Sequence, residues 1–159
     1  MTDYKTMAAQ IRALAEEERD CVPLLANAAA VIFGGMDEIN WAGFYLTDGE
    51  DLLLGPFQGK PACIRIKKGK GVCGSAVMKG SVLRVDDVHA FPGHIACDEA
   101  SRSELVAPMI SGGRIVGVLD IDSPFEGRFD ESDEAGAALL AETIAREADF
   151  SRLAPAPRD

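Results

Sequence analysis

Residues 40–57 run NWAGFYLTDGEDLLLGPF, an aromatic and apolar stretch with a turn signal near its middle. Successive side chains of a strand point to opposite faces, so residues 40–47 place one set of side chains on each face of the predicted sheet. One face carries Trp41, Gly43 and Tyr45, and the other carries Ala42, Phe44 and Leu46. Asp48-Gly49 is a strong hairpin signal. Residues 51–57 are therefore predicted to pair back on the first strand in an antiparallel sheet.

Helical segments precede this sheet. Residues 4–33 are rich in Ala, Leu, Glu and Arg, which favour helix. Pro23 interrupts the run, because proline removes a backbone donor and clashes with the preceding turn. Two helices are therefore predicted, at about 4–19 and 22–33.

More strands and a second helical region follow the hairpin. Strands are predicted at 63–66, 82–85, 104–111 and 114–122, and a short helix at 72–79. Asp130 is a helix-capping residue followed by acidic first-turn charges, which predicts a helix over about 130–150. The tail, residues 151–159, is expected to be frayed.

The order of these elements predicts one α+β domain, residues 1–159, with no internal repeat and no linker. We expect a central antiparallel sheet with the terminal helices packed on one face. The other face is left to the short helix and to a long loop, residues 89–104. A pocket between them is the default location of a ligand.

The composition narrows the classes of partner. The chain has 159 residues, 47% of them hydrophobic, and a formal net charge of −10. This charge repels phosphate backbones and gives no reason to expect an anionic membrane as partner. No apolar run approaches the roughly 18–20 residues that span a bilayer, and residues 1–10 do not resemble a secretory signal. A cytoplasmic location is expected, where thiols are kept reduced.

The loop 89–104 concentrates reactive side chains. It holds both histidines of the chain, His89 and His94, together with Cys97 and several carboxylates. It shows no hydrophobic period, and so long a loop in a compact domain is commonly a lid or a binding loop. Cys97 is therefore the candidate reactive centre.

Two further cysteines, Cys63 and Cys73, also lie in segments next to loops. A thiolate that attacks an oxidised centre becomes a sulfenic acid, and a second thiol condenses with it to a disulfide. This chemistry needs Cys63 or Cys73 to approach Cys97, with Cα atoms roughly 4.4–6.8 Å apart. The simpler interpretation, a buried small apolar residue, applies to any one cysteine alone and is favoured for Cys21.

Three carboxylates form a second candidate cluster. Asp120 and Asp122 alternate with apolar residues on one strand, and Glu104 lies on the neighbouring strand. A solvated sheet face is the alternative interpretation. If the three converge on a dry pocket, at least one must hold a proton that it could donate, and the rest would attract an ammonium group. Trp41 and Tyr45 would form an aromatic wall there, or serve only as core residues.

Five motifs of the chain resemble those of a known family. They are NWAGFY at 40–45, LGPFQGKPACIRI at 54–66, GKGVCGSAV at 69–77, DVHAFPGHIACDEASRSE at 87–104 and GVLDIDSPFEGRF at 117–129. Together they resemble the GAF-domain free methionine-R-sulfoxide reductases. The likeness is close over about residues 38–130. In the flanking segments the resemblance is only that both are helical.

The resemblance implies a GAF-like domain that reduces free L-methionine-(R)-sulfoxide to L-methionine. It implies Cys97 as the nucleophile, Cys63 as the main resolving cysteine and Cys73 as a secondary partner. It also implies thioredoxin as the external dithiol, no bound cofactor or metal, and a homodimer.

The same resemblance implies roles for the pocket residues. Trp41 would contact the methyl and sulfur end of the substrate, and Tyr45 would line the pocket. Glu104 and Asp122 would hydrogen-bond or protonate the sulfoxide oxygen, and Asp120 would help to hold the ammonium group. Because no arginine is at hand for the substrate carboxylate, backbone N–H groups of the loop before Cys97 are expected to bind it.

Two alternatives stay open on the sequence alone. The first is a non-catalytic GAF sensor that binds a small ligand or senses oxidant through Cys97. The second is a zinc protein that uses Cys97, Cys73 and His94, although the closely spaced ligand pairs of most zinc sites are missing.

Overall fold

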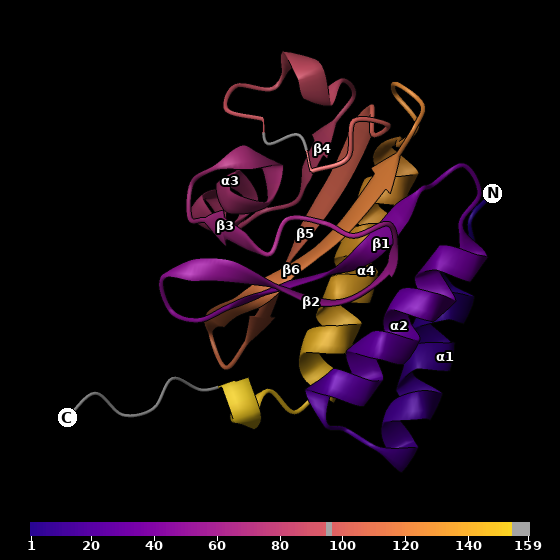
Figure 1. Ribbon diagram of the computed structural model, residues 1–159. Helices are drawn as coiled ribbons and strands as arrows, with labels where there is room; N and C mark the ends of the chain where they lie inside the picture. The colour runs from indigo at the N-terminus through magenta and orange to yellow at the C-terminus, as the bar shows by residue number, and fades with distance from the viewer. Residues whose placement is uncertain (95–96, 154–159) are drawn as a thin grey trace.

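A six-stranded antiparallel sheet forms the centre of the molecule in the computed structural model, which describes residues 1–94 and 97–153 (Figure 1). Its strand order is β3-β2-β1-β6-β5-β4. The strands are β1 (Trp41–Thr47), β2 (Asp51–Gly59), β3 (Arg65–Lys67), β4 (Leu83–Val85), β5 (Ser103–Ser111) and β6 (Arg114–Ser123). The hairpin predicted from residues 40–57 is the pair β1–β2.

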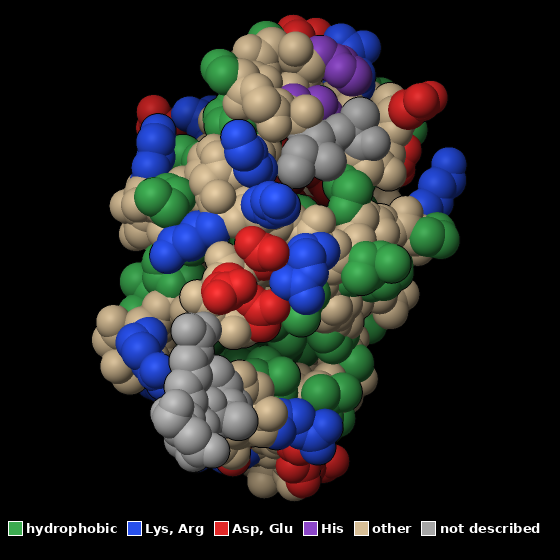
Figure 2. Space-filling model, turned by 60° about the vertical axis from the view of Figure 1, so that its left-hand side comes forward, with side chains coloured by type: hydrophobic (Ala, Val, Ile, Leu, Met, Phe, Trp, Pro, Cys, Tyr) green, Lys and Arg blue, Asp and Glu red, His purple; other side chains and the backbone are tan. Residues whose placement is uncertain are grey.

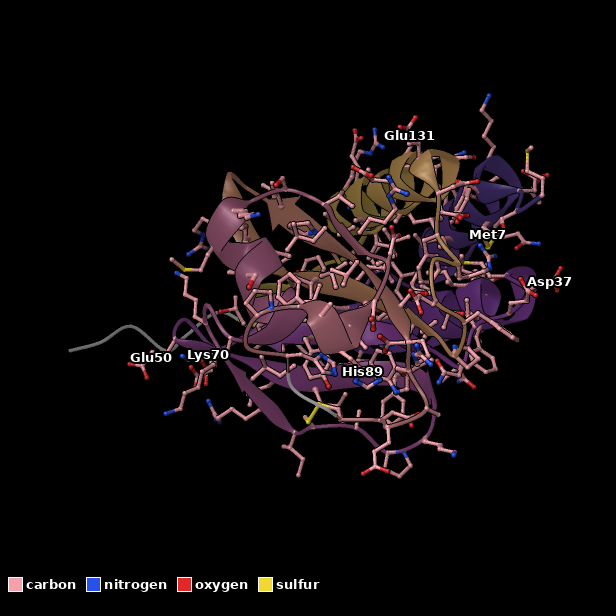
Figure 3. The ribbon with its side chains drawn as sticks, turned by 90° about the horizontal axis from the view of Figure 1, so that it is seen from above. Met7, Asp37, Glu50, Lys70, His89 and Glu131 are labelled. Carbon is pink, nitrogen blue, oxygen red and sulfur yellow. A yellow bond between two sulfur atoms is a disulfide. The ribbon has the colours of Figure 1, made fainter. Side chains whose placement is uncertain are left out.

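Helices cover both faces of the sheet, and the larger ones share one side. These are α1 (Tyr4–Glu17), α2 (Cys21–Gly35) and α4 (Glu131–Glu147), while α3 (Gly71–Lys79) lies on the opposite side. Figure 2 views the molecule from the side that carries α3. Seen from above in Figure 3, Met7 and Glu131 lie with the large helices, and Lys70 and His89 lie away from them. The predicted α+β arrangement is confirmed.

Each face of the sheet buries its own apolar cluster, as the alternation in β1 predicts. Phe44 of β1 joins Leu119 and Ile121 of β6 beneath the three large helices. Trp41 and Tyr45 belong to the second cluster, under α3. The terminal helices therefore cover one face, and the predicted site residues Trp41 and Tyr45 lie on the other.

The two N-terminal helices lie close to their predicted bounds, but Pro23 does not cause the break between them. Helix α1 ends at Glu17, and α2 begins at Cys21, so the break precedes Pro23. The Asp20 side chain caps α2 by accepting a hydrogen bond from the Val22 backbone N–H at 3.0 Å. Proline fits the first turn of a helix because its missing N–H would have no partner there, so Pro23 lies within the first turn of α2 and does not separate the two helices.

The C-terminal segment also differs in part. Helix α4 ends at Glu147, before the predicted limit of residue 150. Ser151–Leu153 of the tail expected to be frayed form a 3-10 helix, and residues 154–159 lie outside the described residues. A second 3-10 helix, Val88–Ala90, opens the long loop. Within the part of the chain that the structure describes, no helix has the length and apolar character needed to span a bilayer.

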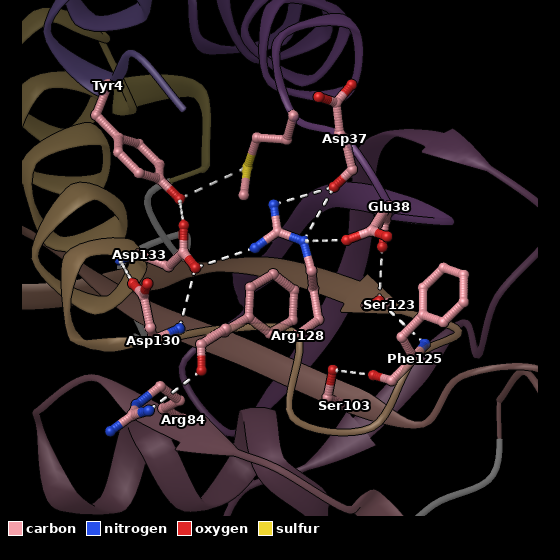
Figure 4. Close-up of polar contacts among 12 residues, drawn as sticks. Tyr4, Asp37, Glu38, Arg84, Ser103, Ser123, Phe125, Arg128, Asp130 and Asp133 are labelled. Carbon is pink, nitrogen blue, oxygen red and sulfur yellow. Dashed lines mark hydrogen bonds and ion pairs between the residues drawn. The ribbon is translucent and has the colours of Figure 1, made fainter. Parts of the chain in front are cut away.

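Arg128, in the loop between β6 and α4, ties the helical layer to the end of β6 (Figure 4). Its Nη1 donates to Asp133 Oδ2 at 3.0 Å, and its Nε and Nη2 donate to the Asp37 carbonyl at 3.1 and 3.0 Å. Asp133 in turn accepts a hydrogen bond of 2.6 Å from the Tyr4 hydroxyl of α1. Asp130 and Asp133 complete a capping box at the start of α4. One guanidinium thus connects three helices with the sheet.

Gly136→Ala is predicted to destabilise the protein. A Cβ at this position of α4 would overlap the Tyr4 ring of α1, and overpacking of this kind costs typically ~1–3 kcal/mol. Urea unfolding should show a lower midpoint with an unchanged slope. Gly34→Ala in α2 is the matched control, because nothing lies within 4 Å of the added Cβ. An unchanged midpoint for Gly136→Ala would contradict the close contact of α1 with α4.

Candidate active site

The strand register brings the predicted pocket residues together. Asp122 of β6 lies opposite Trp41 of β1 on one side and opposite Glu104 of β5 on the other. Asp120 stands two residues away on the same face, opposite Gly43. Because side chains alternate along a strand, these residues all face away from the large helices.

Two loops close over this face. Cys63, just before β3, forms a disulfide with Cys97 of the loop between β4 and β5, with Cα atoms 5.4 Å apart (the yellow bond in Figure 3). The required approach of a second cysteine to Cys97 is therefore met by Cys63. Cys73 of α3 and Cys21 of α2 are free and buried. Cys21 belongs to the core under the large helices, as expected.

A cavity lies between the disulfide, α3 and the sheet. Its lining includes seven of the predicted site residues: Trp41, Tyr45, Cys73, Cys97, Glu104, Asp120 and Asp122. The eighth, Cys63, reaches the cavity through its bond to Cys97. The structure thus brings these eight predicted side chains together.

The three carboxyl groups of the cavity lie close to one another, with Glu104 and Asp120 buried and Asp122 partly exposed. Burial raises the pKa of Glu104, and the neighbouring Asp120 charge raises it further. Burial and then the Asp120 charge also raise the pKa of Asp122, and burial raises the pKa of Asp120 itself. Loss of hydration is the first cause for all three groups, and the like charge of Asp120 adds to it for Glu104 and Asp122. These carboxyl groups therefore stay protonated to a higher pH than exposed carboxyl groups do.

The aromatic side chains have fixed positions. The Trp41 ring stacks between Tyr45 and Phe57, with ring centroids 5.9 and 5.2 Å away, and its Nε1 donates to the Lys60 carbonyl at 3.1 Å. A Cβ at Gly43 would overlap the Phe57 Cβ and would lie 2.8 Å from the Trp41 ring, so glycine is needed at this position. Neither Phe57 as a cavity-side aromatic nor the need for glycine at position 43 follows from the sequence pattern alone.

Tyr45 links the cavity to the segment that carries Cys63. Its hydroxyl donates a 2.9 Å hydrogen bond to the Cys63 carbonyl. Burial, followed by the Asp120 charge, raises the pKa of the phenol, so it stays a hydrogen-bond donor at physiological pH. Tyr45 therefore positions the backbone next to the disulfide as well as lining the cavity.

His94 is a cavity residue that the sequence placed only in the zinc alternative. Its Nε2 is buried and has no hydrogen-bond partner, and its ring meets that of His89 edge to face at 5.8 Å. Figure 2 shows both histidines, in purple, at one end of this face. Burial and then His89 lower the pKa of His94, which favours a neutral ring.

The zinc alternative built on Cys97, Cys73 and His94 is wrong for this structure, because the Cys97 sulfur is bonded to Cys63. In the described residues, a different set brings its ligand-type atoms within 4.8 Å of one another: Cys73, Glu104 and Asp120. The backbone site expected for the substrate carboxylate includes residues 95–96, which lie outside the described residues. The cavity as described suits a small cationic or methyl-bearing ligand that meets a redox-active cysteine pair.

Known proteins share this sequence and architecture. A model of the GAF domain matches residues 15–146. Protein YtsP of Bacillus subtilis is 54% identical over 89% of this chain and 88% of its own length. The free methionine-R-sulfoxide reductase of Escherichia coli is 50% identical over 86% of this chain and 83% of its own.

Solved structures give the same result. The X-ray structure of the free methionine-R-sulfoxide reductase from Neisseria meningitidis in complex with its substrate has a TM-score of 0.88 and 45% identity. The match covers 95% of this chain and 91% of that one. The expected GAF-like fold is thereby confirmed, and the chain belongs to the GAF-domain family that includes the free methionine-R-sulfoxide reductases.

Proposed function

We propose that this protein reduces free L-methionine-(R)-sulfoxide to L-methionine. The observation that carries the proposal is the Cys63–Cys97 disulfide beside a cavity of buried carboxyl groups. Sulfoxide reduction needs a nucleophile, a proton donor for the departing oxygen and a second thiol. The cavity offers all three, and relatives with this activity by name share about half of the sequence.

Cys97 starts the reaction in its reduced form. Its thiolate attacks the sulfoxide sulfur while the oxygen takes up protons, and methionine leaves as the oxygen passes to Cys97 as a sulfenic acid. Cys63 then attacks the Cys97 sulfur and releases the oxygen as water, which forms the disulfide. An external dithiol, proposed to be thioredoxin, reduces this bond by exchange. One sulfoxide and two protein thiols thus give methionine, water and the disulfide that the structure contains.

Glu104 and Asp122 are proposed to hydrogen-bond the sulfoxide oxygen and supply its protons. Their raised pKa values keep them protonated where exposed carboxyl groups would be ionised. They lie opposite each other across β5 and β6, so both can reach one oxygen. In this scheme Cys73 is a secondary thiol of the cavity, because Cys63 is already bonded to Cys97.

The remaining cavity residues are proposed to bind the free amino acid. Asp120 Oδ1 is buried without a hydrogen-bond partner, which suits a substrate ammonium group. Trp41, held between two other rings, would contact the methyl and sulfur end. Lys70 and His94 also line the cavity, and they are its candidate partners for the substrate carboxylate beside the backbone of the loop. The homodimer and the cytoplasmic location stay predictions.

The first prediction concerns the nucleophile. Wild-type protein with dithiothreitol should release methionine from the R epimer of free methionine sulfoxide and not from the S epimer. Cys97→Ser should lose this activity, since a hydroxyl cannot replace the thiolate as nucleophile. Cys21→Ala, which changes a thiol on the other side of the sheet, should keep it. Binding of the sulfoxide without turnover of either epimer would favour the sensor alternative instead.

The second prediction concerns the proton donor. Single-turnover reduction by the reduced protein should slow as pH rises through the raised pKa of Glu104, because only the protonated carboxyl group donates. Glu104→Gln should lower the rate by roughly 10²–10⁴ and remove this alkaline decline. Glu142→Gln, an exposed residue of α4, should leave the profile unchanged. An alkaline decline that persists in Glu104→Gln would assign the proton donor elsewhere.

The third prediction concerns the free amino group. N-acetyl-methionine-(R)-sulfoxide lacks the charge that Asp120 is proposed to bind, and the buried Asp120 oxygen would stay unpaired. Its kcat/KM should therefore fall at least about tenfold, the ratio that 1.4 kcal/mol represents. Asp120→Asn should narrow the difference between the free and the acetylated substrate. Equal kcat/KM values for the two substrates in the wild type would contradict this role.

A further inference from the structure

The Cys73 thiol stays free when the other two cavity cysteines form their disulfide. It is 3% exposed, and its Sγ lies 3.8 Å from Glu104 Oε1. One oxygen of Asp120 joins them, and the three ligand-type atoms lie within 4.8 Å of one another. A thiol and two carboxyl groups are thus gathered in the cavity in its oxidised state.

One atom of this group has no partner. Asp120 is 5% exposed, and its Oδ1 is buried without a hydrogen bond. A buried polar atom of this kind costs free energy unless a ligand satisfies it. Asp120 lines the cavity, so the unsatisfied oxygen is available to a ligand bound there.

The spacing suits a tetrahedral metal ion. Zinc binds thiolate at about 2.3 Å and carboxylate oxygen at about 2.0–2.2 Å, so its sulfur and oxygen ligands stand roughly 3.5 Å apart. The Cys73 Sγ to Glu104 Oε1 distance of 3.8 Å is close to this value. A mixed thiolate and carboxylate set favours zinc over magnesium or calcium, which prefer oxygen alone.

We propose that the oxidised protein binds one zinc-class divalent cation through Cys73, Glu104 and Asp120, and that this ion excludes the substrate. The thiol and any protonated carboxyl group release their protons as the ion binds. The ion and a substrate ammonium group would both bind the Asp120 carboxylate, so they compete. Metal binding itself does not depend on the proposed function, whereas the competition does.

Cobalt and zinc test this site in protein whose disulfide is intact. Cys63 and Cys97 are then blocked, so a near-ultraviolet sulfur-to-cobalt charge-transfer band reports Cys73 or Cys21. We expect one equivalent of Co²⁺ to give this band in the wild type and in Cys21→Ala, and Zn²⁺ to displace it. Cys73→Ser should abolish the band. Free methionine should displace the ion if the proposed function holds.

Equilibrium dialysis of Zn²⁺ supplies the second measurement. Glu104→Gln removes a ligand and should weaken binding by more than the roughly 10- to 100-fold that loss of an outer partner costs. Glu16→Gln changes an exposed carboxylate of α1 and should bind Zn²⁺ like the wild type. A wild type that binds no metal, or a band that survives in Cys73→Ser, would overturn the site. Tight Zn²⁺ binding that methionine leaves unchanged would overturn the competition alone.

Discussion

The pairing of β6 with β1 and β5 is the constraint from which both the core and the cavity follow. Asp120 and Asp122 alternate with Leu119 and Ile121, so one register places the leucine and isoleucine under the large helices and the aspartates in the cavity. A slip by one residue would exchange the two sets and bury two carboxylates in the helical core. The burial of Leu119 and Ile121 therefore also fixes the position of the acids.

The carboxyl groups of the cavity destabilise the folded state, and the apolar core on the opposite face of the sheet offsets this. Three carboxyl groups with raised pKa values have lost hydration, and ionising them in the folded state is unfavourable. Their contribution to stability falls as pH rises from the unfolded pKa toward the folded pKa, because the folded state holds protons that the unfolded chain has released. The apolar layer beneath the helices and the buried Arg128–Asp133 ion pair stabilise the fold independently of that cavity.

Local patterns in the sequence predicted most of the fold and most of the residues that line the cavity. The alternation in residues 40–47 and the Asp48-Gly49 turn are local, and they determined the hairpin. The sequence could not choose between Cys63 and Cys73 as partner of Cys97 without the family resemblance, because the choice depends on how separate segments approach. The Arg128 contacts with Asp37 and Asp133 and the Trp41–Phe57 stack have the same origin in tertiary packing. The two N-terminal helices were predicted close to their bounds, but Pro23 is not the cause of the break, because proline is favourable in a first helical turn and unfavourable in later ones.

The arrangement of charge in the cavity connects the two proposals, the amino-acid substrate and the metal ion. A site that donates protons to a departing oxygen needs carboxyl groups shielded from water, and the same shielding makes any unpaired oxygen, such as Asp120 Oδ1, attractive to a cation. An ammonium group satisfies it through hydrogen bonds and leaves the Cys73 thiol protonated. A zinc-class ion also takes Cys73 as a ligand. The Cys73 thiol on α3 is therefore the group that distinguishes the two cations, because only the metal ion binds it.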